Sequence, residues 1–248
     1  MKSQIVTHKN LNNGNPVEIH YPISDSEFIN QVSEIFEQEH YKEGKVKDGV
    51  YVDLGANIGL TALYFKDCAK EYYAVEPSSQ CFEALNKNTQ GLNIKLFNFA
   101  IWPREKEQYL YQTSEESTGQ TFFANGSKAF GRELVQCKRI DTFFEDNKIE
   151  HVDVLKIDVE SSEYVILPDD SFSRVADKID LIIGEGHFDS MTGAIPNIIP
   201  IILKDYGFET RFTDTQNMIY KFCYTQKKGD KKTYEYIMNT MFVARRKK

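Results

Sequence analysis

A glycine-punctuated segment, Val50–Gly59, constrains the fold of this chain more than any other stretch of its sequence. Its first half, Val50–Leu54, fits the core of a buried strand. Gly55 and Gly59 permit a tight turn at which the backbone approaches a ligand closely. A helix is expected to begin near Leu60. The segment therefore predicts the first strand, turn and helix of a nucleotide-binding α/β sheet.

An acidic residue follows at the position that such units use for ribose. After the expected helix, Tyr72–Val75 forms a second strand that leads into Glu76 and Pro77. In nucleotide-binding βαβ units, an acidic side chain about 20 residues after the glycine turn binds the ribose hydroxyls. The spacing from Gly55 to Glu76 fits that pattern, so the ligand expected here is an adenosine cofactor.

The residues of the turn discriminate between adenosine cofactors. NAD and FAD sites use G-x-G-x-x-G, whose glycines bring the backbone against a pyrophosphate. This chain instead has Gly55-x-x-x-Gly59, preceded by Asp53 and containing Asn57. A carboxylate in this loop repels a pyrophosphate but accepts a hydrogen bond from an ammonium group. S-adenosylmethionine carries an ammonium group and a sulfonium and has no phosphate, so we expect it as the cofactor.

Three segments together carry a family resemblance. Val52–Gly59, Ala74–Pro77 and Leu155–Glu160 resemble, in order and spacing, the motifs of the FkbM-type S-adenosylmethionine-dependent methyltransferases. The resemblance extends from about Asp48 to His187. It implies an α/β, Rossmann-like class I methyltransferase fold with a doubly wound seven-stranded sheet in the order 3-2-1-4-5-7-6. The last strand is then antiparallel, and a β-hairpin-like insertion interrupts the alternation of strands and helices.

The chain divides into an N-terminal strand and helix extension, residues 1–47, and a methyltransferase domain, residues 48–248. In the extension, Val17–Tyr21 alternates as a strand and Glu27–His40 places its apolar residues at helical spacing. This helix is expected to pack over the cofactor cleft or the sheet edge. The seven sheet strands are expected near residues 50–54, 72–75, 94–99, 152–157, 179–184, 208–212 and 241–244.

The expected insertion lies between the third and fourth sheet strands. Gln108–Tyr111 and Leu134–Cys137 are predicted as antiparallel strands around a polar loop at residues 113–132. Long loops in compact domains tend to be functional. The loop resembles the family's insertion, and the alternative is a plain surface loop. Its candidates for contact with the methyl acceptor are Ser117, Thr118 and Phe130.

Ligands of doubly wound sheets bind beyond the carboxyl ends of the parallel strands. Residues at or after the ends of the first four strands are therefore the expected cofactor contacts. Glu76 is expected at the ribose, and the segment from Asn98 to Ile101 near the adenine. The full set is Asp53, Gly55, Ala56, Asn57, Gly59, Glu76, Pro77, Asn98, Ala100 and Asp158.

The fourth and fifth strands deliver four titratable groups to the same edge: Asp158, Glu160, Glu185 and His187. Methyl transfer to a hydroxyl needs alignment of donor and acceptor and removal of a proton. His187 has the reference pKa best suited to a base near neutral pH, and Asp158 is nearest in the chain to the expected methyl group. The competing roles are cofactor binding or helix capping for Asp158 and a structural loop position for His187.

The same four side chains are also an alternative divalent-metal site, since carboxylates and imidazole suit Mg²⁺ or Mn²⁺. The metal-free base is the preferred prediction, because spacing along strand ends does not establish coordination geometry. Glu163 is expected to form a pair within its own helix turn.

One departure from the family pattern bears on function. The pattern continues from the acidic pair with Gly-Ala-Glu, whereas this chain has Ser161, Ser162 and Glu163. A side chain at 161 is expected to narrow the pocket or change the turn, and it supports a competing interpretation as a non-catalytic S-adenosylmethionine-binding sensor or scaffold. An NAD-dependent oxidoreductase is a second competitor, based on Tyr224 and Lys228, but the glycine fingerprint of that class is missing.

Composition narrows the acceptor and the compartment. The formal net charge of -7 argues against a general nucleic-acid binder, and no segment is long and apolar enough for a membrane helix. The four cysteines form no C-x-x-C pair, and no signal peptide is visible, so a reducing, cytoplasmic location is expected. The expected partner is a small-molecule or saccharide hydroxyl acceptor, without nucleic acid or membrane. A homo-oligomer is compatible with these observations.

Overall fold

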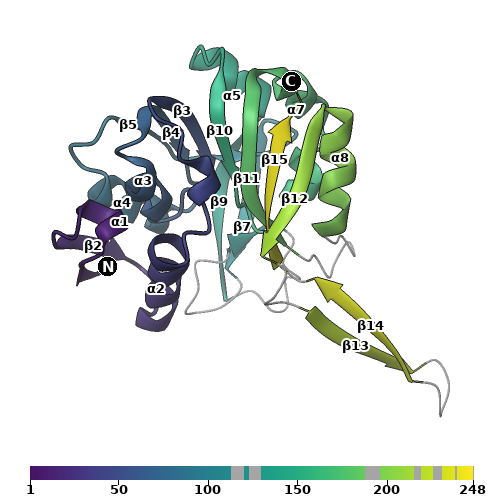
Figure 1. Cartoon of the computed structure of the whole chain (residues 1–248), viewed down its shortest axis with the longest axis horizontal. Coiled ribbons are helices and arrows are strands. Elements are labelled where there is room, and N and C mark those ends of the chain that lie inside the picture. The colour runs from purple at the N-terminus through teal and green to yellow at the C-terminus, as the bar shows by residue number, and fades with distance from the viewer. Residues whose placement is uncertain are drawn as a thin grey trace.

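A seven-stranded mixed sheet forms the centre of the molecule (Figure 1). The computed structural model describes residues 1–112, 120–122, 130–187, 196–214, 219–225, 231–237 and 239–247. The sheet contains β3 (Gly49–Leu54), β4 (Ala69–Val75), β5 (Ile94–Phe97), β10 (Val152–Ile157), β11 (Ile179–His187), β12 (Phe208–Asp214) and β15 (Asn239–Arg246). Its order is β5-β4-β3-β10-β11-β15-β12, and β15 is antiparallel to both neighbours. Numbered along the chain, this is 3-2-1-4-5-7-6, which confirms the predicted fold.

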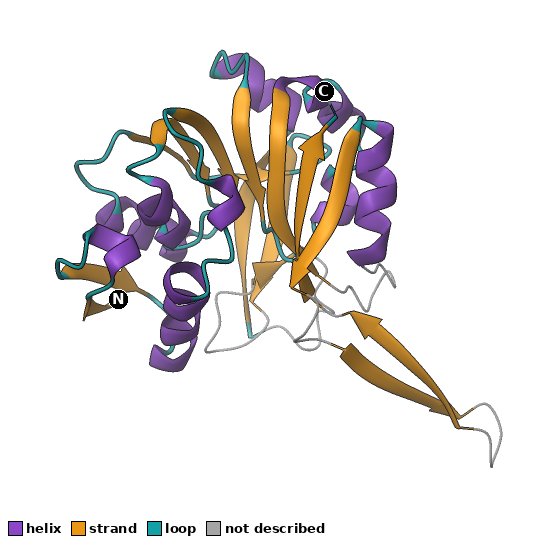
Figure 2. Cartoon of the chain, in the orientation of Figure 1, coloured by secondary structure: helices purple, strands orange, loops and turns teal. Residues whose placement is uncertain are grey.

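Both faces of the sheet are covered, as Figure 2 shows. Successive side chains of a strand point to opposite faces, so Tyr51 and Val52 of β3 enter two different hydrophobic clusters. The Tyr51 cluster includes residues of α3 (Leu60–Phe65) and α4 (Ser79–Asn88). The Val52 cluster includes residues of α5 (Ile140–Asp146), α6 (Glu163–Ile166), α7 (Asp170–Ser173) and α8 (Ile199–Asp205). The strand ends therefore sit on a rigid, doubly buried platform.

The N-terminal 47 residues pack on the face that carries α3 and α4. They form β1 (Lys2–Val6), α1 (Lys9–Asn12), β2 (Val17–Tyr21), α2 (Asp25–Val32), a π-helix (Ser33–Glu37) and a 3₁₀ turn (Lys42–Gly44). Leu11, Ile19, Phe28 and Phe36 join the hydrophobic cluster of Tyr51. The strand prediction at 17–21 is confirmed. The predicted helix starts earlier, because Ser24 caps it by accepting a hydrogen bond from the Glu27 amide, and it widens into the π-helix.

The insertion forms a second sheet of four strands. These are β6 (Ala100–Ile101), β7 (Lys106–Gln112), β8 (Gln120–Thr121) and β9 (Gly131–Lys138), with β7 antiparallel to β8 and β9. The two predicted strands are confirmed within β7 and β9. Phe130 is 61% exposed, while Ser117 and Thr118 lie outside the described residues.

The structure adds a feature that the sequence analysis did not predict. β13 (Ile219–Thr225) and β14 (Lys231–Ile237) pair as an antiparallel ribbon, which Figure 1 shows projecting from the body. No strand was predicted between the expected strands at 208–212 and 241–244. Among the helices that are described, none has the length and apolar character to cross a membrane.

Candidate active site

The turn after β3 brings two chain segments into unusually close contact at Gly55. Gly55 has a φ of 80°, and a Cβ at this residue would lie 1.9 Å from the carbonyl oxygen of Asp158. Gly59, at a φ of 88°, begins α3, and its missing side chain makes room for Leu85 of α4. Gly55 therefore sets the approach of the loop to the end of β10, whereas Gly59 serves the packing of two helices.

A buried charge cluster lies beneath this turn. The Lys156 ammonium is 3.1 Å from Asp53 Oδ1 and 3.5 Å from Asp158 Oδ2, and it donates to the Gly55 carbonyl at 2.5 Å. Tyr72 donates to the other oxygen of Asp53 at 2.7 Å. Burial by itself would lower the pKa of Lys156, but the Asp53 and Asp158 carboxylates outweigh it and raise that pKa. Lys156 therefore holds the turn as a permanent cation.

Glu76 joins the turn to the start of α4. Its two carboxylate oxygens accept hydrogen bonds from the backbone amides of Asn57 and Ser78, each at 2.8 Å. The side chain is buried, and burial raises the pKa of Glu76 to about 7. Asn98 donates to the carbonyl oxygens of Glu76 and Pro77, and so fixes the backbone of this segment.

Two cavities open at the carboxyl edge of the sheet. The first encloses about 680 Å³ of empty space, part of which is open to solvent. Its lining includes Glu76 and Pro77 and, from the insertion, Ala100, Ile101 and Phe122. The cavity therefore offers both an acidic group and apolar surface, which suits an adenosine.

The second cavity, of about 920 Å³, lies between the turn and the N-terminal extension. Its acidic lining residues are Glu27, Glu34, Asp158, Glu160 and Glu185, and its basic ones include Lys156, His40 and His187. The two cavities share four lining residues: Gly55, Asn57, Asp158 and Glu160. The shared residues mark the point at which groups held in the two cavities meet.

Most predicted cofactor residues line one cavity or both, but three do not. Those that do are Gly55, Ala56, Asn57, Glu76, Pro77, Ala100 and Asp158. Asp53, Gly59 and Asn98 line neither cavity. Their roles in the structure are to hold Lys156, to seat α3 on α4, and to fix the Glu76–Pro77 backbone, so each supports the site from behind.

The four predicted catalytic groups converge on one nitrogen. His187 Nε2 lies 3.7 Å from Asp158 Oδ1, 3.7 Å from Glu160 Oε2 and 3.9 Å from Glu185 Oε1. The His187 side chain is 8% exposed. The structure thus brings together all four residues that the strand-end argument named.

Burial would lower the pKa of His187, but the carboxylates around it, foremost Glu160 and Glu163, raise that pKa well above its usual value. A protonated imidazole has no free base site, so the raised pKa argues against His187 as the base that its reference pKa suggested. Burial raises the pKa of Glu185 to about 7 and also raises that of Glu160. The carboxylates are the better candidates for accepting a proton.

Glu163 belongs to the site, although we had expected only a pair within its helix turn. It is fully buried, and its Oε1 lies 3.2 Å from His187 Nδ1 and accepts from the Val159 amide at 2.9 Å. A carboxylate in the first turn of a helix behind an acidic strand end was the available signal. The link to His187 could not be read from it, because the partners are 24 residues apart.

Tyr41 is a second site residue that the sequence did not single out. Its hydroxyl donates to Asp158 Oδ2 at 3.3 Å, and the side chain is buried. Burial, followed by the nearby Asp158 carboxylate, raises the pKa of Tyr41 well above its usual value, so it remains a donor. The N-terminal extension therefore reaches the catalytic edge, in keeping with the expectation that it covers the cleft.

Ser161 keeps the turn that the family builds with glycine. Its φ is 75°, and it lines neither cavity, so it neither narrows the pocket nor abolishes the turn. A left-handed conformation costs a residue with a side chain about 1–2 kcal/mol. We expect Ser161→Gly to raise the free energy of unfolding by about 1 kcal/mol in urea titrations. Ser162→Gly is the control: Ser162 has a φ of -74°, so that change should give no gain.

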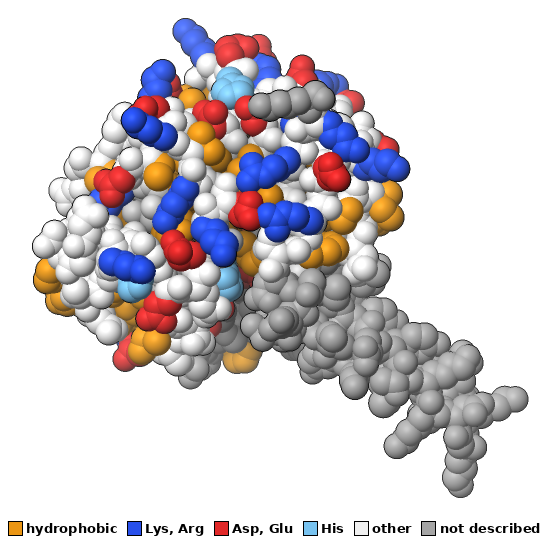
Figure 3. Space-filling view, in the orientation of Figure 1, with side chains coloured by type: hydrophobic (Ala, Val, Ile, Leu, Met, Phe, Trp, Pro, Cys, Tyr) orange, Lys and Arg blue, Asp and Glu red, His pale blue; other side chains and the backbone are white. Residues whose placement is uncertain are grey.

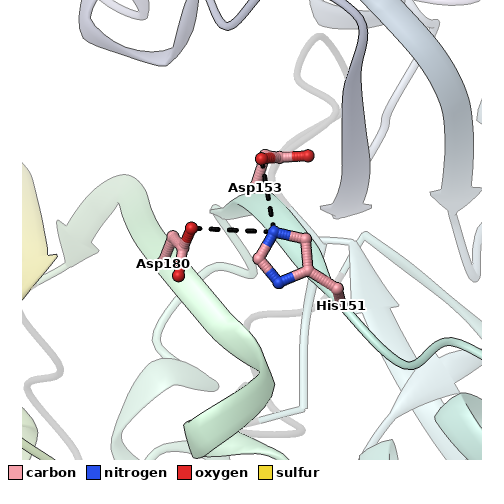
Figure 4. A group of neighbouring side chains, drawn as sticks. All are labelled: His151, Asp153 and Asp180. Carbon is pink, nitrogen blue, oxygen red and sulfur yellow. Dashed lines mark hydrogen bonds and ion pairs between the residues drawn. The ribbon is translucent and has the colours of Figure 1, made fainter.

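Another histidine cluster lies at the opposite edge of the sheet (Figure 4). His151 Nε2 is 3.3 Å from Asp153 Oδ1 and 3.6 Å from Asp180 Oδ2. The residues lie at the beginnings of β10 and β11, and the His151 side chain is 51% exposed. Exposed pairs of this kind contribute little, and no cavity described above reaches them.

A family model and several solved structures match this chain. The model of the methyltransferase FkbM domain matches residues 53–210, which is more than half of the chain. No curated protein matches. Among solved structures, this chain is similar to precorrin-6y C5,15-methyltransferase from Geobacter metallireducens, with 12% identity, a TM-score of 0.46 and coverage of 92% of each chain.

Two further solved structures are similar over most of this chain. Magnesium protoporphyrin IX methyltransferase from Synechocystis, solved with bound S-adenosylmethionine, has 10% identity, a TM-score of 0.46, and coverage of 90% of this chain and 81% of that one. Aeropyrum pernix fibrillarin, also with bound S-adenosylmethionine, has 15% identity, a TM-score of 0.43, and coverage of 81% and 68%. At this identity the likenesses concern the fold alone. On the match of residues 53–210, the chain belongs to the FkbM family of S-adenosylmethionine-dependent methyltransferases.

Proposed function

We propose that this enzyme methylates a hydroxyl group of a small molecule or saccharide, with the cofactor in the first cavity and the acceptor in the second. The observation that carries the proposal is the junction of the cavities. Gly55, Asn57, Asp158 and Glu160 line both, so donor and acceptor meet beside two carboxylates. Alignment of the reacting groups is the main requirement of a displacement reaction.

The residues present fit S-adenosylmethionine. Glu76 offers an acidic group for the ribose hydroxyls, and Ala100 and Ile101 offer apolar surface for the adenine. Asp158, which lines both cavities, places negative charge where the sulfonium and ammonium groups belong. Once bound, the cofactor supplies a methyl group: an oxygen–carbon bond forms as the carbon–sulfur bond breaks, and the electron pair of the broken bond stays on sulfur to leave S-adenosylhomocysteine.

The chain's own groups then handle the acceptor's proton. We assign its removal to Glu160, a carboxylate that lines both cavities and is partly open to solvent. Asp158 is held from behind by Tyr41 and Lys156, so its other oxygen keeps a fixed position toward His187. These groups orient the hydroxyl that Glu160 deprotonates.

Charge and shape favour a small acceptor over a nucleic acid. The acidic second cavity would repel phosphates, and the whole chain has a net charge of -7. Basic and acidic side chains are interspersed on the face in Figure 3, and Arg211 and Arg245 both pair with Glu43.

The described cysteines, Cys68, Cys81 and Cys137, are free thiols, which fits our proposal of a reducing, cytoplasmic location.

The non-catalytic alternative depended on the serines at 161 and 162. The turn at Ser161 is retained without intrusion into either cavity, which removes that part of the argument, whereas Ser162 lines the first cavity. The NAD alternative would require a pyrophosphate beside the acidic junction.

Calorimetric titration followed by an acceptor screen tests the proposal. We expect S-adenosylmethionine and S-adenosylhomocysteine to bind and NAD not to bind. With an acceptor identified, Glu160→Gln should lower kcat by about 10²–10⁴-fold while cofactor affinity stays near that of the wild type. Glu27→Gln, a matched change elsewhere in the second cavity, should leave kcat within about tenfold. Full turnover by Glu160→Gln would remove our assignment of the base, and binding of NAD alone would remove the cofactor assignment.

A further inference from the structure

We propose that Asp158, Glu185 and His187 bind a divalent cation, which holds the acceptor's hydroxyl in the second cavity. Each residue offers one ligand atom, and these atoms lie within 4.8 Å of one another. Two carboxylates with one imidazole form a donor set for Mn²⁺ and related divalent ions. The cation's role in methyl transfer rests on the proposed function, but its binding does not.

The spacing of the ligand atoms fits a shared central ion better than hydrogen bonds. Asp158 Oδ1 is 3.7 Å and Glu185 Oε1 is 3.9 Å from His187 Nε2. Hydrogen bonds between such groups are about 2.7–3.2 Å long. Ligands at about 2.0–2.2 Å from one ion lie about 3 Å apart when adjacent and about 4 Å apart when opposite. Both distances to His187 Nε2 fall between these limits.

The histidine is already oriented for a ligand role by a buried partner. Metal-bound histidines usually donate their other ring N–H to a carboxylate. Glu163 Oε1 lies 3.2 Å from His187 Nδ1, and the Val159 amide fixes the same oxygen. Glu163 is 0% exposed, and within the described part of the chain its Oε2 has no hydrogen-bond partner. With Nδ1 held by Glu163, Nε2 points at Asp158 and Glu185.

The charge of the surroundings also calls for a cation. Glu160 adds a further carboxylate 3.7 Å from His187 Nε2, and Glu27 and Glu34 line the same cavity. Neighbouring carboxylates repel one another unless a positive partner compensates them. A divalent ion supplies two charges and also polarises a bound hydroxyl, leaving Glu160 free to accept the proton.

The cluster of His151, Asp153 and Asp180 provides an internal control. It has a similar donor set, but His151 is exposed, and Asp153 Oδ1 lies within hydrogen-bonding reach of its Nε2, at 3.3 Å. Asp153 also accepts a hydrogen bond from the Val50 amide. One histidine with two carboxylates therefore occurs in both clusters, once at the cavity and once on the surface, and of these two only the first has a buried carboxylate behind its histidine.

Titration of the metal-free protein with Mn²⁺, followed by electron paramagnetic resonance and calorimetry without cofactor or acceptor, tests the inference. We expect one micromolar site in the wild type. Glu185→Gln and His187→Ala should remove it, Glu163→Gln should weaken it by about 10–100-fold, and His151→Ala should leave it unchanged. Circular dichroism and S-adenosylmethionine binding show that each variant is folded.

The outcomes separate this inference from the proposed function. The proposed cation site would be overturned if no Mn²⁺ bound at millimolar concentration. It would also be overturned if His151→Ala lost the site and His187→Ala kept it. Mn²⁺ binding in an enzyme that methylates no hydroxyl would leave the site standing and remove the proposed function. Hydroxyl methylation that continues in a chelator at the full rate would overturn the cation's role in holding the acceptor.

Discussion

Replacing Lys156 by methionine is expected to lower the free energy of unfolding by about 3–5 kcal/mol. Lys156 is almost fully buried, and its ammonium compensates the buried Asp53 carboxylate at 3.1 Å. Methionine preserves much of the aliphatic stem but leaves that carboxylate unpaired, which costs more than the ion pair itself contributes. The variant also loses the hydrogen bond to the Gly55 carbonyl, so cofactor affinity should fall with stability. Urea unfolding and calorimetric titration measure the two effects.

A double-mutant cycle identifies the cause. Asp53→Asn removes the charge that Lys156 compensates, so the double variant should lose less than the sum of the two single losses. Additive losses would show that Lys156 stabilises the fold through contacts other than this pair. Lys178→Met is the control, since Lys178 pairs with the exposed Glu150 side chain and its loss should cost less than about 1 kcal/mol.

Gly55→Ala is expected to abolish detectable binding of S-adenosylmethionine and to destabilise the sheet. The added Cβ would lie 1.9 Å from the Asp158 carbonyl oxygen, so β3 and the end of β10 must move apart. The Asp158 amide donates to the Leu54 carbonyl at 3.1 Å immediately beside this contact, and separation of the strands would break that bond. Both cavities share Gly55 and Asp158, so the displacement distorts donor and acceptor sites together.

Gly14→Ala separates the cost of the backbone conformation from the cost of the close approach at Gly55. Gly14 has the same φ of 80°, but nothing lies within 4 Å of an added Cβ. It should therefore show only the conformational cost of about 1–2 kcal/mol and bind the cofactor normally. Equal losses in the two variants would mean that backbone conformation, rather than close approach, explains the role of Gly55.

The sequence predicted the sheet and its edge because both are encoded locally. Largely apolar runs such as Val50–Leu54 mark strands buried on both faces, and polar residues such as Asp158 lie at or just after their ends. Parallel strands deliver these ends to one edge, so Asp158 and His187 could be placed together without knowledge of side-chain contacts. The order of the strands came from the family resemblance, since alternation alone does not determine it.

What the sequence did not predict depends on contacts between distant segments. Tyr41 reaches Asp158 across 117 positions, and nothing around Tyr41 indicates that partner. Asp53 was expected to face the cofactor, because strand ends usually do, but the buried Lys156 draws its carboxylate inward. The raised pKa of His187 likewise arises from carboxylates on several elements. No single stretch of the sequence therefore indicates it.

The position of β15 has a consequence for synthesis of the chain. β15 lies between β11 and β12 and pairs with both, yet both are translated before it. Until residues 239–246 leave the ribosome, each of those strands has an open hydrogen-bonding edge, and open edges recruit other chains. A chain interrupted shortly before Asn239 would keep the residues of the candidate site and still leave both edges open, so the pairing of β15 is the step that closes the sheet.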